Sequence, residues 1–135
     1  MKTTIQKVVE AYTILGTTKT GKLEASEVIT IARVRKQLRP TVESFNEYSR
    51  ELHDKFKTQN LDAIIAKVQN NEDLNEREQK EFRDYNALMN EGLNKELLQE
   101  VELADVPKIS EETLAKLSSE GNWEMRVFEL FEILL

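Results

Sequence analysis

Hydrophobic side chains recur every seven residues through the middle of the chain, in two interleaved series. On an α-helix this spacing brings both series onto one face, as at the a and d positions of a helix-packing interface. We therefore predict one long helix from about residue 24 to residue 57, and we name its apolar stripe the seam. The seam consists of Val28, Ile31, Leu38, Val42, Phe45, Leu52 and Phe56.

Pro40 lies inside this predicted helix. A proline in a helix interior removes one backbone hydrogen bond and crowds the preceding turn, at a cost of about 3 kcal/mol. The seven-residue phase of the seam is nevertheless the same on both sides of the proline. We therefore expect one continuous helix that is kinked near Arg39.

A shorter helix is predicted over residues 4–15, where apolar residues recur at helical spacing. Thr3 or Thr4 would cap its start, and Gly16 would follow its end. Several β-branched residues keep a strand open as the alternative for this segment. The next residues, GTTKTGK at 16–22, are expected to form a polar loop.

The second half of the chain alternates predicted helices with polar breaks. Asn60 can cap a short helix that ends near residue 70, and Asn75 with Glu78 has the form of a capping box for a helix that continues to Leu97. Residues 100–106 alternate polar and apolar side chains, which indicates a short extended segment whose partner strand is not evident. Ser110 is a suitable N-cap for a further short helix.

The last segment, residues 123–135, is apolar around most of its circumference. Such a wide apolar arc must be covered, so it either packs between the earlier helices or forms an oligomer interface. A membrane anchor is not expected, because the segment is short and contains three glutamates.

Together these elements predict a mainly α fold in a single helical domain, residues 1–135. The expected architecture is a helical bundle built on a long kinked helix hairpin, in which the long helix pairs with the helix over residues 75–97. At most a short extended segment would lie near residues 100–106. The low content of turn-forming residues, 4 Gly and 2 Pro, agrees with long regular elements.

The absence of cysteine from the sequence excludes disulfides, thiolate metal sites and a cysteine nucleophile. No apolar run approaches the roughly 20 residues that span a bilayer, and the first residues are too polar for a signal peptide. We therefore expect a cytoplasmic protein without membrane contact, and we expect no cofactor and no metal.

Charge is distributed unevenly along the chain. Residues 1–40 carry eight Lys and Arg against three Asp and Glu, a net charge of +5, whereas residues 41–135 carry eleven against twenty-two, a net charge of −11. The basic part can lie against the acidic part within one fold, or the two can meet across a homo-oligomer. A separate charged partner is the third alternative.

The segment from Gly16 to Lys22 has the glycine and lysine spacing of a phosphate-binding loop. Such a loop needs Ser or Thr after the lysine to hold Mg²⁺, but this chain has Leu23 there. A nucleotide fold of this type also needs a parallel sheet, for which the chain has no material. We therefore expect an ordinary polar loop.

Other catalytic patterns are weak. His53 is the single histidine, and we expect it to be an exposed helix residue rather than a metal ligand. The carboxylates around residues 76–84 alternate with Lys and Arg, as in a solvent-facing helix surface laced with ion pairs. No acid–base pair stands out among them.

A basic patch on the long helix is the more serious candidate for a binding site. It comprises Arg33, Arg35, Lys36 and Arg39, and Lys22 precedes it in the loop. Such a patch can follow a phosphate backbone or face an acidic protein partner. Arg35 also occupies an a position of the seam, where an arginine is expected to meet a carboxylate of a neighbouring helix.

Two segments resemble small accessory proteins of tailed bacteriophages and prophages. They are IARVRKQLRPTVESFNEYSRELHDKF at residues 31–56 and KELLQEVELADVPKISEETLAKL at residues 95–117, which together cover about a third of the chain. The first is similar to the long helix of those proteins, and the second to their leucine-rich helix end with the Pro-Lys-Ile-Ser entry into a final helix. The resemblance implies phage assembly or host takeover by binding, inside a bacterial cell.

We therefore expect a non-enzymatic protein–protein interaction or assembly protein that associates with a protein partner or with itself. A nucleic-acid-binding module using the basic patch at residues 33–39 is the alternative, and an enzyme of unrecognised type is a third. Burial of the seam is the main stabilising contribution, so replacing Phe45 or Leu52 by Ala is expected to cost about 2–5 kcal/mol.

Overall fold

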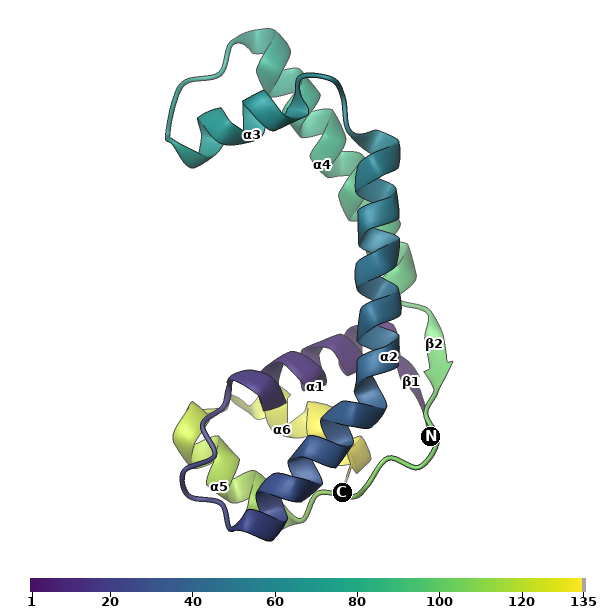
Figure 1. Ribbon diagram of the computed structural model, residues 1–135, viewed down its shortest axis with the longest axis vertical. Coiled ribbons are helices and arrows are strands. Elements are labelled where there is room, and N and C mark those ends of the chain that lie inside the picture. The colour runs from purple at the N-terminus through teal and green to yellow at the C-terminus, as the bar shows by residue number, and fades with distance from the viewer. Residues whose placement is uncertain (135) are drawn as a thin grey trace. The chain divides into compact units, whose positions relative to one another are not determined.

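The computed structural model describes residues 1–134 and is mainly helical, as the sequence predicts (Figure 1). Six α-helices and one two-stranded sheet account for the regular structure of the described residues. In chain order these elements are β1 (Lys2–Thr4), α1 (Ile5–Thr17), α2 (Ala25–Phe56), α3 (Leu61–Gln69), α4 (Glu76–Leu97), β2 (Glu100–Glu102), α5 (Glu111–Gly121) and α6 (Met125–Phe131), with a 3₁₀ turn, η1 (Glu132–Leu134), after α6.

The chain divides into two compact units. Unit 1 comprises Met1–Ser44 and Leu98–Leu135, and unit 2 comprises Phe45–Leu97. Helix α2 belongs to both, because the division falls inside it at residue 44. The expected single domain stays a prediction, and each unit is described by itself.

In unit 1 the helices form a bundle around one apolar core. Helix α1, the first part of α2, α5 and α6 all contribute to it, and Val34, Leu117 and Phe131 are completely buried. The rest of this cluster consists of Val8, Ala11, Leu15, Ile31, Leu38, Val42, Leu103, Ile109, Leu114, Val127, Leu130 and Leu134.

Strands β1 and β2 pair antiparallel, with Thr3 opposite Val101. The partner of the predicted extended segment is thus the start of the chain, which sequence patterning did not identify. The strand ends at Glu102, earlier than residue 106, and Asp105 adopts a positive φ of 58° that is incompatible with continued extension.

Helix α1 begins as predicted, because the Thr4 side chain accepts a hydrogen bond from the Lys7 amide. It ends two residues later than expected, so Gly16 and Thr17 belong to the helix and not to the loop. The hydroxyl and the amide of Thr18 both donate to the Ile14 carbonyl, which satisfies an acceptor at the helix end.

Helix α2 runs through Pro40 without interruption and matches the predicted span within one residue at each end. The seam, in contrast, is not uniformly buried. Ile31, Leu38 and Val42 lie in the core of unit 1, whereas the three seam residues in unit 2 are only half-buried.

The prediction was wrong for Val28, which is 37% exposed. Counting 100° per residue, Glu27 lies about 40° from Ile31 around the helix and Val28 about 60° away on the other side. The side of α2 that faces the core of unit 1 therefore includes Glu27 and not Val28. By the same geometry the core includes Val34, which the seven-residue series omitted.

Unit 2 contains the expected helix hairpin. The last part of α2 packs antiparallel to α4: the His53 ring nitrogen hydrogen-bonds the Tyr85 hydroxyl, and the Thr58 hydroxyl, just beyond α2, donates to Glu81. A Cβ at Gly92 would lie 2.7 Å from a methyl carbon of Leu52, so glycine permits the close approach of these helices.

The capping box that opens α4 is also confirmed. The Glu78 amide donates to the Asn75 side chain over 2.8 Å, and the Asn75 amide donates to the Glu78 carboxylate over 3.2 Å.

The apolar end of the chain packs inside unit 1, the first of the two predicted alternatives. Val127, Leu130, Phe131 and Leu134 are buried in the core. The outer side of α6 leaves Met125 73% exposed. The expectations for Leu135 and for the Ile133 side chain lie outside the described residues.

Candidate functional site

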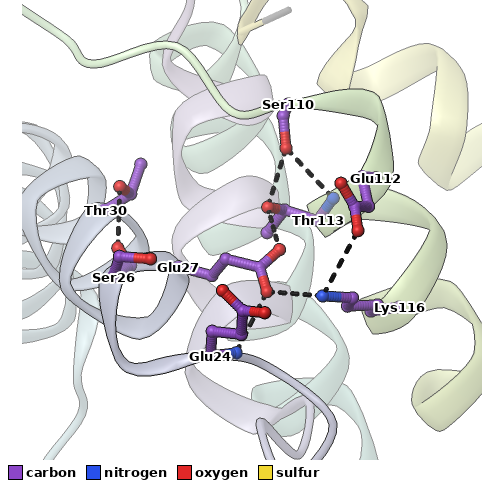
Figure 2. Close-up of polar contacts among 8 residues, drawn as sticks. All are labelled: Glu24, Ser26, Glu27, Thr30, Ser110, Glu112, Thr113 and Lys116. Carbon is purple, nitrogen blue, oxygen red and sulfur yellow. Dashed lines mark hydrogen bonds and ion pairs between the residues drawn. The ribbon is translucent and has the colours of Figure 1, made fainter.

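Glu27 is the centre of a polar cluster that joins α2 to α5 in unit 1 (Figure 2). Its carboxylate accepts hydrogen bonds from the Lys116 ammonium group and the Thr113 hydroxyl, both over 2.6 Å. It also accepts from the Glu24 amide over 3.0 Å, which satisfies a free donor at the start of α2. The cluster therefore fastens the first turn of α2 to α5.

Hydrogen bonds from Lys116, and next from Thr113, lower the pKa of Glu27 from its ordinary value of 4.5 to about 2. The bond to Glu27 in turn raises the pKa of Lys116. Each charge stabilises the other across the packing contact between α2 and α5. Both groups are thus held in their ionised forms at neutral pH.

The hydroxyl groups of this cluster are also engaged. Ser110 caps α5 by accepting from the Thr113 amide over 3.1 Å, and its hydroxyl shares a hydrogen bond with that of Thr113. Carboxylate, ammonium and hydroxyl groups all hold helix ends together here. We name this arrangement the clasp: Glu27, Ser110, Thr113 and Lys116. A catalytic hydroxyl needs a nearby base that is free to take its proton, whereas the Glu27 carboxylate already accepts three hydrogen bonds. The contacts of the clasp therefore favour a structural role.

The sequence analysis did not identify this clasp. Two signals were present: Ser110, Thr113 and Lys116 follow one another at intervals of three residues, which places them along one side of a helix. A glutamate one turn before Ile31 also lies on the packing side of α2. Nothing in the sequence pairs these two helices, so the contact itself was not predictable.

Among the described residues, Arg35 forms no ion pair with a carboxylate, contrary to the expectation. Its guanidinium group lies 4.0 Å from the centre of the Tyr12 ring, and its Nε donates to the Tyr12 carbonyl over 3.4 Å. A Cβ at Gly16 would lie 2.5 Å from an Arg35 nitrogen, so this arginine fills the space beside the glycine. The seam position thus accepts a cation because an aromatic face and a helix carbonyl replace the carboxylate.

Tyr12 also holds a second arginine. The Arg39 Nε donates to the Tyr12 hydroxyl over 3.4 Å, and this hydrogen bond raises the pKa of Arg39. Arg33 and Lys36 are exposed on α2. Within residues 1–134, none of these four cations of α2 forms an ion pair.

Lys22 lies apart from the other predicted basic residues. Its ammonium group donates to the Ser119 hydroxyl over 3.1 Å and is 3.8 Å from a Glu120 carboxylate oxygen. The lysine of the segment that resembles a phosphate loop is therefore directed to α5. Because Gly16 is helical, that segment also lacks the loop conformation expected at its first residue.

His53 is half-buried, not exposed as predicted, because it contacts Tyr85 within the hairpin. Burial raises the pKa of the Tyr85 hydroxyl. Among the described residues, no group of His, Asp and Glu side chains has an arrangement that could hold a metal ion.

A groove of about 530 Å³ lies in unit 1 and is lined by residues of α1 and α6. Lys7, Glu10, Arg126 and Glu129 line it together with Leu98 and Leu130. None of its four charged side chains is buried, so the groove lacks the desolvated group that tunes an acid or base in an enzyme pocket.

The apolar side chains of unit 2 form the strongest candidate for a binding surface. Of the nineteen buried hydrophobic residues in the described part of the chain, sixteen belong to unit 1 and only Leu61, Ile64 and Met89 to unit 2. Many other apolar side chains of the hairpin remain half-buried or exposed. We name seven of them the hairpin surface: Phe45, Tyr48, Leu52, Phe56, Val68, Leu88 and Leu93.

In residues 1–134, no helix has both the length and the apolar character needed to cross a membrane. No protein-family model matches the chain, and comparisons with curated proteins and with solved structures find no similar protein.

Proposed function

We propose that the protein is a non-enzymatic assembly protein that associates with further copies of itself through the hairpin surface of unit 2. The observation that carries this proposal is the contrast in burial: the same apolar spacing that is buried at Leu38 is only half-covered at Phe45, Leu52 and Phe56. Apolar side chains in this state gain free energy when another surface covers them.

The hairpin offers aromatic and aliphatic side chains suited to such association. Phe45, Tyr48 and Phe56 supply large apolar areas, and Val68 and Leu88 are 40% and 42% exposed. Aromatic residues are enriched at protein interfaces because each covers much area with few rotatable bonds. A second hairpin can cover these residues by the same helix packing that joins α2 to α4.

The side chains that could act as catalytic acids, bases or nucleophiles are engaged with one another, which favours a binding role over an enzymatic one. Glu27, Thr113 and Lys116 bond to one another, and His53 bonds to Tyr85. A nucleic-acid-binding module that uses Arg33, Arg35, Lys36 and Arg39 stays the alternative. It predicts binding to duplex DNA that weakens steeply with added salt.

The test is association in solution, measured by sedimentation velocity at high salt over a wide range of protein concentration. We expect the wild type to associate, and the double variant Val68→Gln, Leu88→Gln to associate at least tenfold more weakly. These side chains are largely outside the packed interior, so circular dichroism should show an unchanged helix content.

The matched control is Leu98→Gln with Met125→Gln. Among the described side chains of unit 1, these are the two most exposed large hydrophobic ones, at 69% and 73%. The control should associate like the wild type. A wild type that is monomeric at every concentration, or a control that weakens association as much as the hairpin variant, would contradict the proposal.

We further propose a phage or prophage origin and a location in the bacterial cytoplasm, on the resemblance of residues 31–56 and 95–117 to phage accessory proteins. Capsid, tail or other phage genes beside its coding sequence would support this origin. A neighbourhood of housekeeping genes would count against it.

A further inference from the structure

The first part of α2 is apolar on two sides. Ile31 and Val34 lie in the core of unit 1, whereas Val28 and Ile29 are 37% and 50% exposed. Counting about 100° per residue, the exposed set lies within an arc of about 100° that is centred about 140° from the core-facing side. We name this set the outer stripe: Ala25, Val28, Ile29 and Ala32. Its spacing is that of a helix face that packs against another helix.

Two of the polar side chains that lie between these residues in the sequence are bonded within unit 1. The Thr30 hydroxyl donates to the Ser26 carbonyl over 3.1 Å, and the Glu27 carboxylate belongs to the clasp with α5 (Figure 2). A partner that covers the outer stripe therefore neither breaks these bonds nor leaves the two groups unpaired.

The same face of α2 becomes basic beyond Ala32. Lys36 and Arg39 continue the line of the outer stripe by one and two turns, and Arg33 lies beside it. All three cations are exposed. Arg39 is also held in position, because its Nε donates to the Tyr12 hydroxyl, and an ordered side chain loses less conformational entropy on binding.

The length and the order of these two parts specify a partner. From Ala25 to Arg39 the face rises about 21 Å, or about four turns, apolar in the first half and positively charged in the second. A complementary surface therefore needs apolar side chains beside carboxylates. An amphipathic helix of about 14 residues has this length and can carry both groups on one side.

We propose that this face of α2 binds an amphipathic helix of another protein. The apolar residues of that helix cover the outer stripe by ridge-into-groove packing, and its Asp or Glu side chains pair with Arg33, Lys36 and Arg39. Nucleic acid is less suited, because a phosphate backbone has no apolar surface to cover Val28 and Ile29. The inference goes beyond association through the hairpin surface, because both the surface, in unit 1, and the partner are different.

The first experiment uses a display library of helical peptides of about 16 residues, randomised on one face and selected for binding to the full-length chain. We expect the enriched peptides to carry apolar residues at intervals of three and four over two turns. Acidic residues should follow or precede them on the same face, because the cations of α2 lie to one end of the outer stripe.

An enriched peptide is then titrated against variants of the full-length chain by fluorescence anisotropy. Val28→Gln with Ile29→Gln should weaken binding about tenfold at both low and high salt, because the apolar contact is lost. Arg33→Gln, Lys36→Gln, Arg39→Gln should weaken it about tenfold at low salt and much less at high salt, because salt screens exposed charges. Circular dichroism should show an unchanged helix content in both variants, since glutamine is a good helix former.

Each variant has a matched control at exposed residues of unit 1. Leu98→Gln with Met125→Gln removes two exposed apolar side chains outside the outer stripe. Lys7→Gln, Lys19→Gln, Lys108→Gln changes the net charge by the same amount as the triple variant of α2. Both controls should bind the peptide like the wild type.

The hairpin variant Val68→Gln, Leu88→Gln should also bind the peptide like the wild type. Loss of self-association in that variant and loss of peptide binding in the variants of α2 are therefore separate results, and either proposal can fail without the other.

The proposal is overturned if no peptide is enriched, if the enriched peptides lack acidic residues, or if the Val28→Gln, Ile29→Gln variant binds them as well as the wild type does. It is also overturned if that variant loses self-association in sedimentation velocity, since a second copy would then cover the outer stripe. Binding of phosphatidylglycerol vesicles by the wild type and not by that variant would likewise contradict it, because the face would then be a membrane-binding surface.

Discussion

Units 1 and 2 share one helix, yet they bury its apolar stripe to different degrees. Leu38, in unit 1, is 1% exposed and lies in a core made by four helices. Leu52, two heptads further along the same helix, is half-buried against Gly92 of α4. A repeated pattern therefore tells which side chains share a face, whereas the number of elements that cover the face decides their burial.

The largest expected effect compares the same substitution in both units. Leu38→Ala should lower the free energy of unfolding by about 2–5 kcal/mol, because the side chain is almost completely buried in the core of unit 1. Leu52→Ala should cost less than about 2 kcal/mol, since part of the side chain already contacts water. The structure thus predicts a smaller loss of stability for Leu52→Ala than the about 2–5 kcal/mol expected from the sequence alone. Urea denaturation followed by circular dichroism gives both values, and equal losses would remove the distinction between the units.

The clasp at Glu27 gives the next effect and a pH dependence. Its pKa of about 2 lies below the ordinary value of 4.5, so its stabilising contribution is complete above about pH 4.5 and is lost as the pH falls toward 2. At neutral pH, Glu27→Gln should lower the thermal midpoint by about 4–8 °C.

This difference in midpoint should shrink steadily between pH 4.5 and 2. Glu129→Gln serves as the control, because Glu129 is exposed and forms no ion pair within the described residues. A midpoint difference for Glu27→Gln that is constant over this pH range would show that the carboxylate charge does not stabilise unit 1.

Helix caps allow a smaller comparison between the units. Ser110→Ala in unit 1 should cost about 1 kcal/mol, because it removes the cap of α5 and a hydrogen-bond partner of Thr113. Asn75→Ala removes the exposed cap of α4 in unit 2 and should cost about 0.5 kcal/mol. Chemical denaturation of both variants measures the two losses in stability. A larger loss for Asn75→Ala than for Ser110→Ala would contradict this prediction.

The contact between Leu52 and Gly92 predicts the smallest net change. Gly92→Ala gains about 1 kcal/mol of helix propensity but displaces Leu52, so the two effects should nearly cancel. In a Leu52→Ala background the same substitution should stabilise by about 1 kcal/mol. A double-mutant cycle measures this coupling. Equal effects in the two backgrounds would argue against the close packing of α2 on α4.

The helices were predictable because their signals are local. The threonine before α1, the capping box of Asn75 and Glu78, and Ser110 before α5 each satisfy backbone donors within a few residues. The seven-residue spacing likewise identified α2 through Pro40, since periodicity along one helix needs no knowledge of its neighbours.

The sites were less predictable because they depend on contacts between distant segments. Glu27 meets Lys116 across 89 residues of sequence, and Arg35 meets Tyr12 across 23. No periodicity encodes such pairs. The same reason explains the error at Val28: a strict heptad series assigned it to the interface, whereas the neighbouring helix α5 meets the Glu27 side of α2.

Amide hydrogen exchange of the wild type at low and high protein concentration, both at high salt, tests the role of the hairpin surface most directly. We expect protection to increase with concentration in residues 45–56 and in α4, and to stay unchanged in α1, α5 and α6. Exchange that is the same at both concentrations, or added protection confined to unit 1, would contradict association through the hairpin.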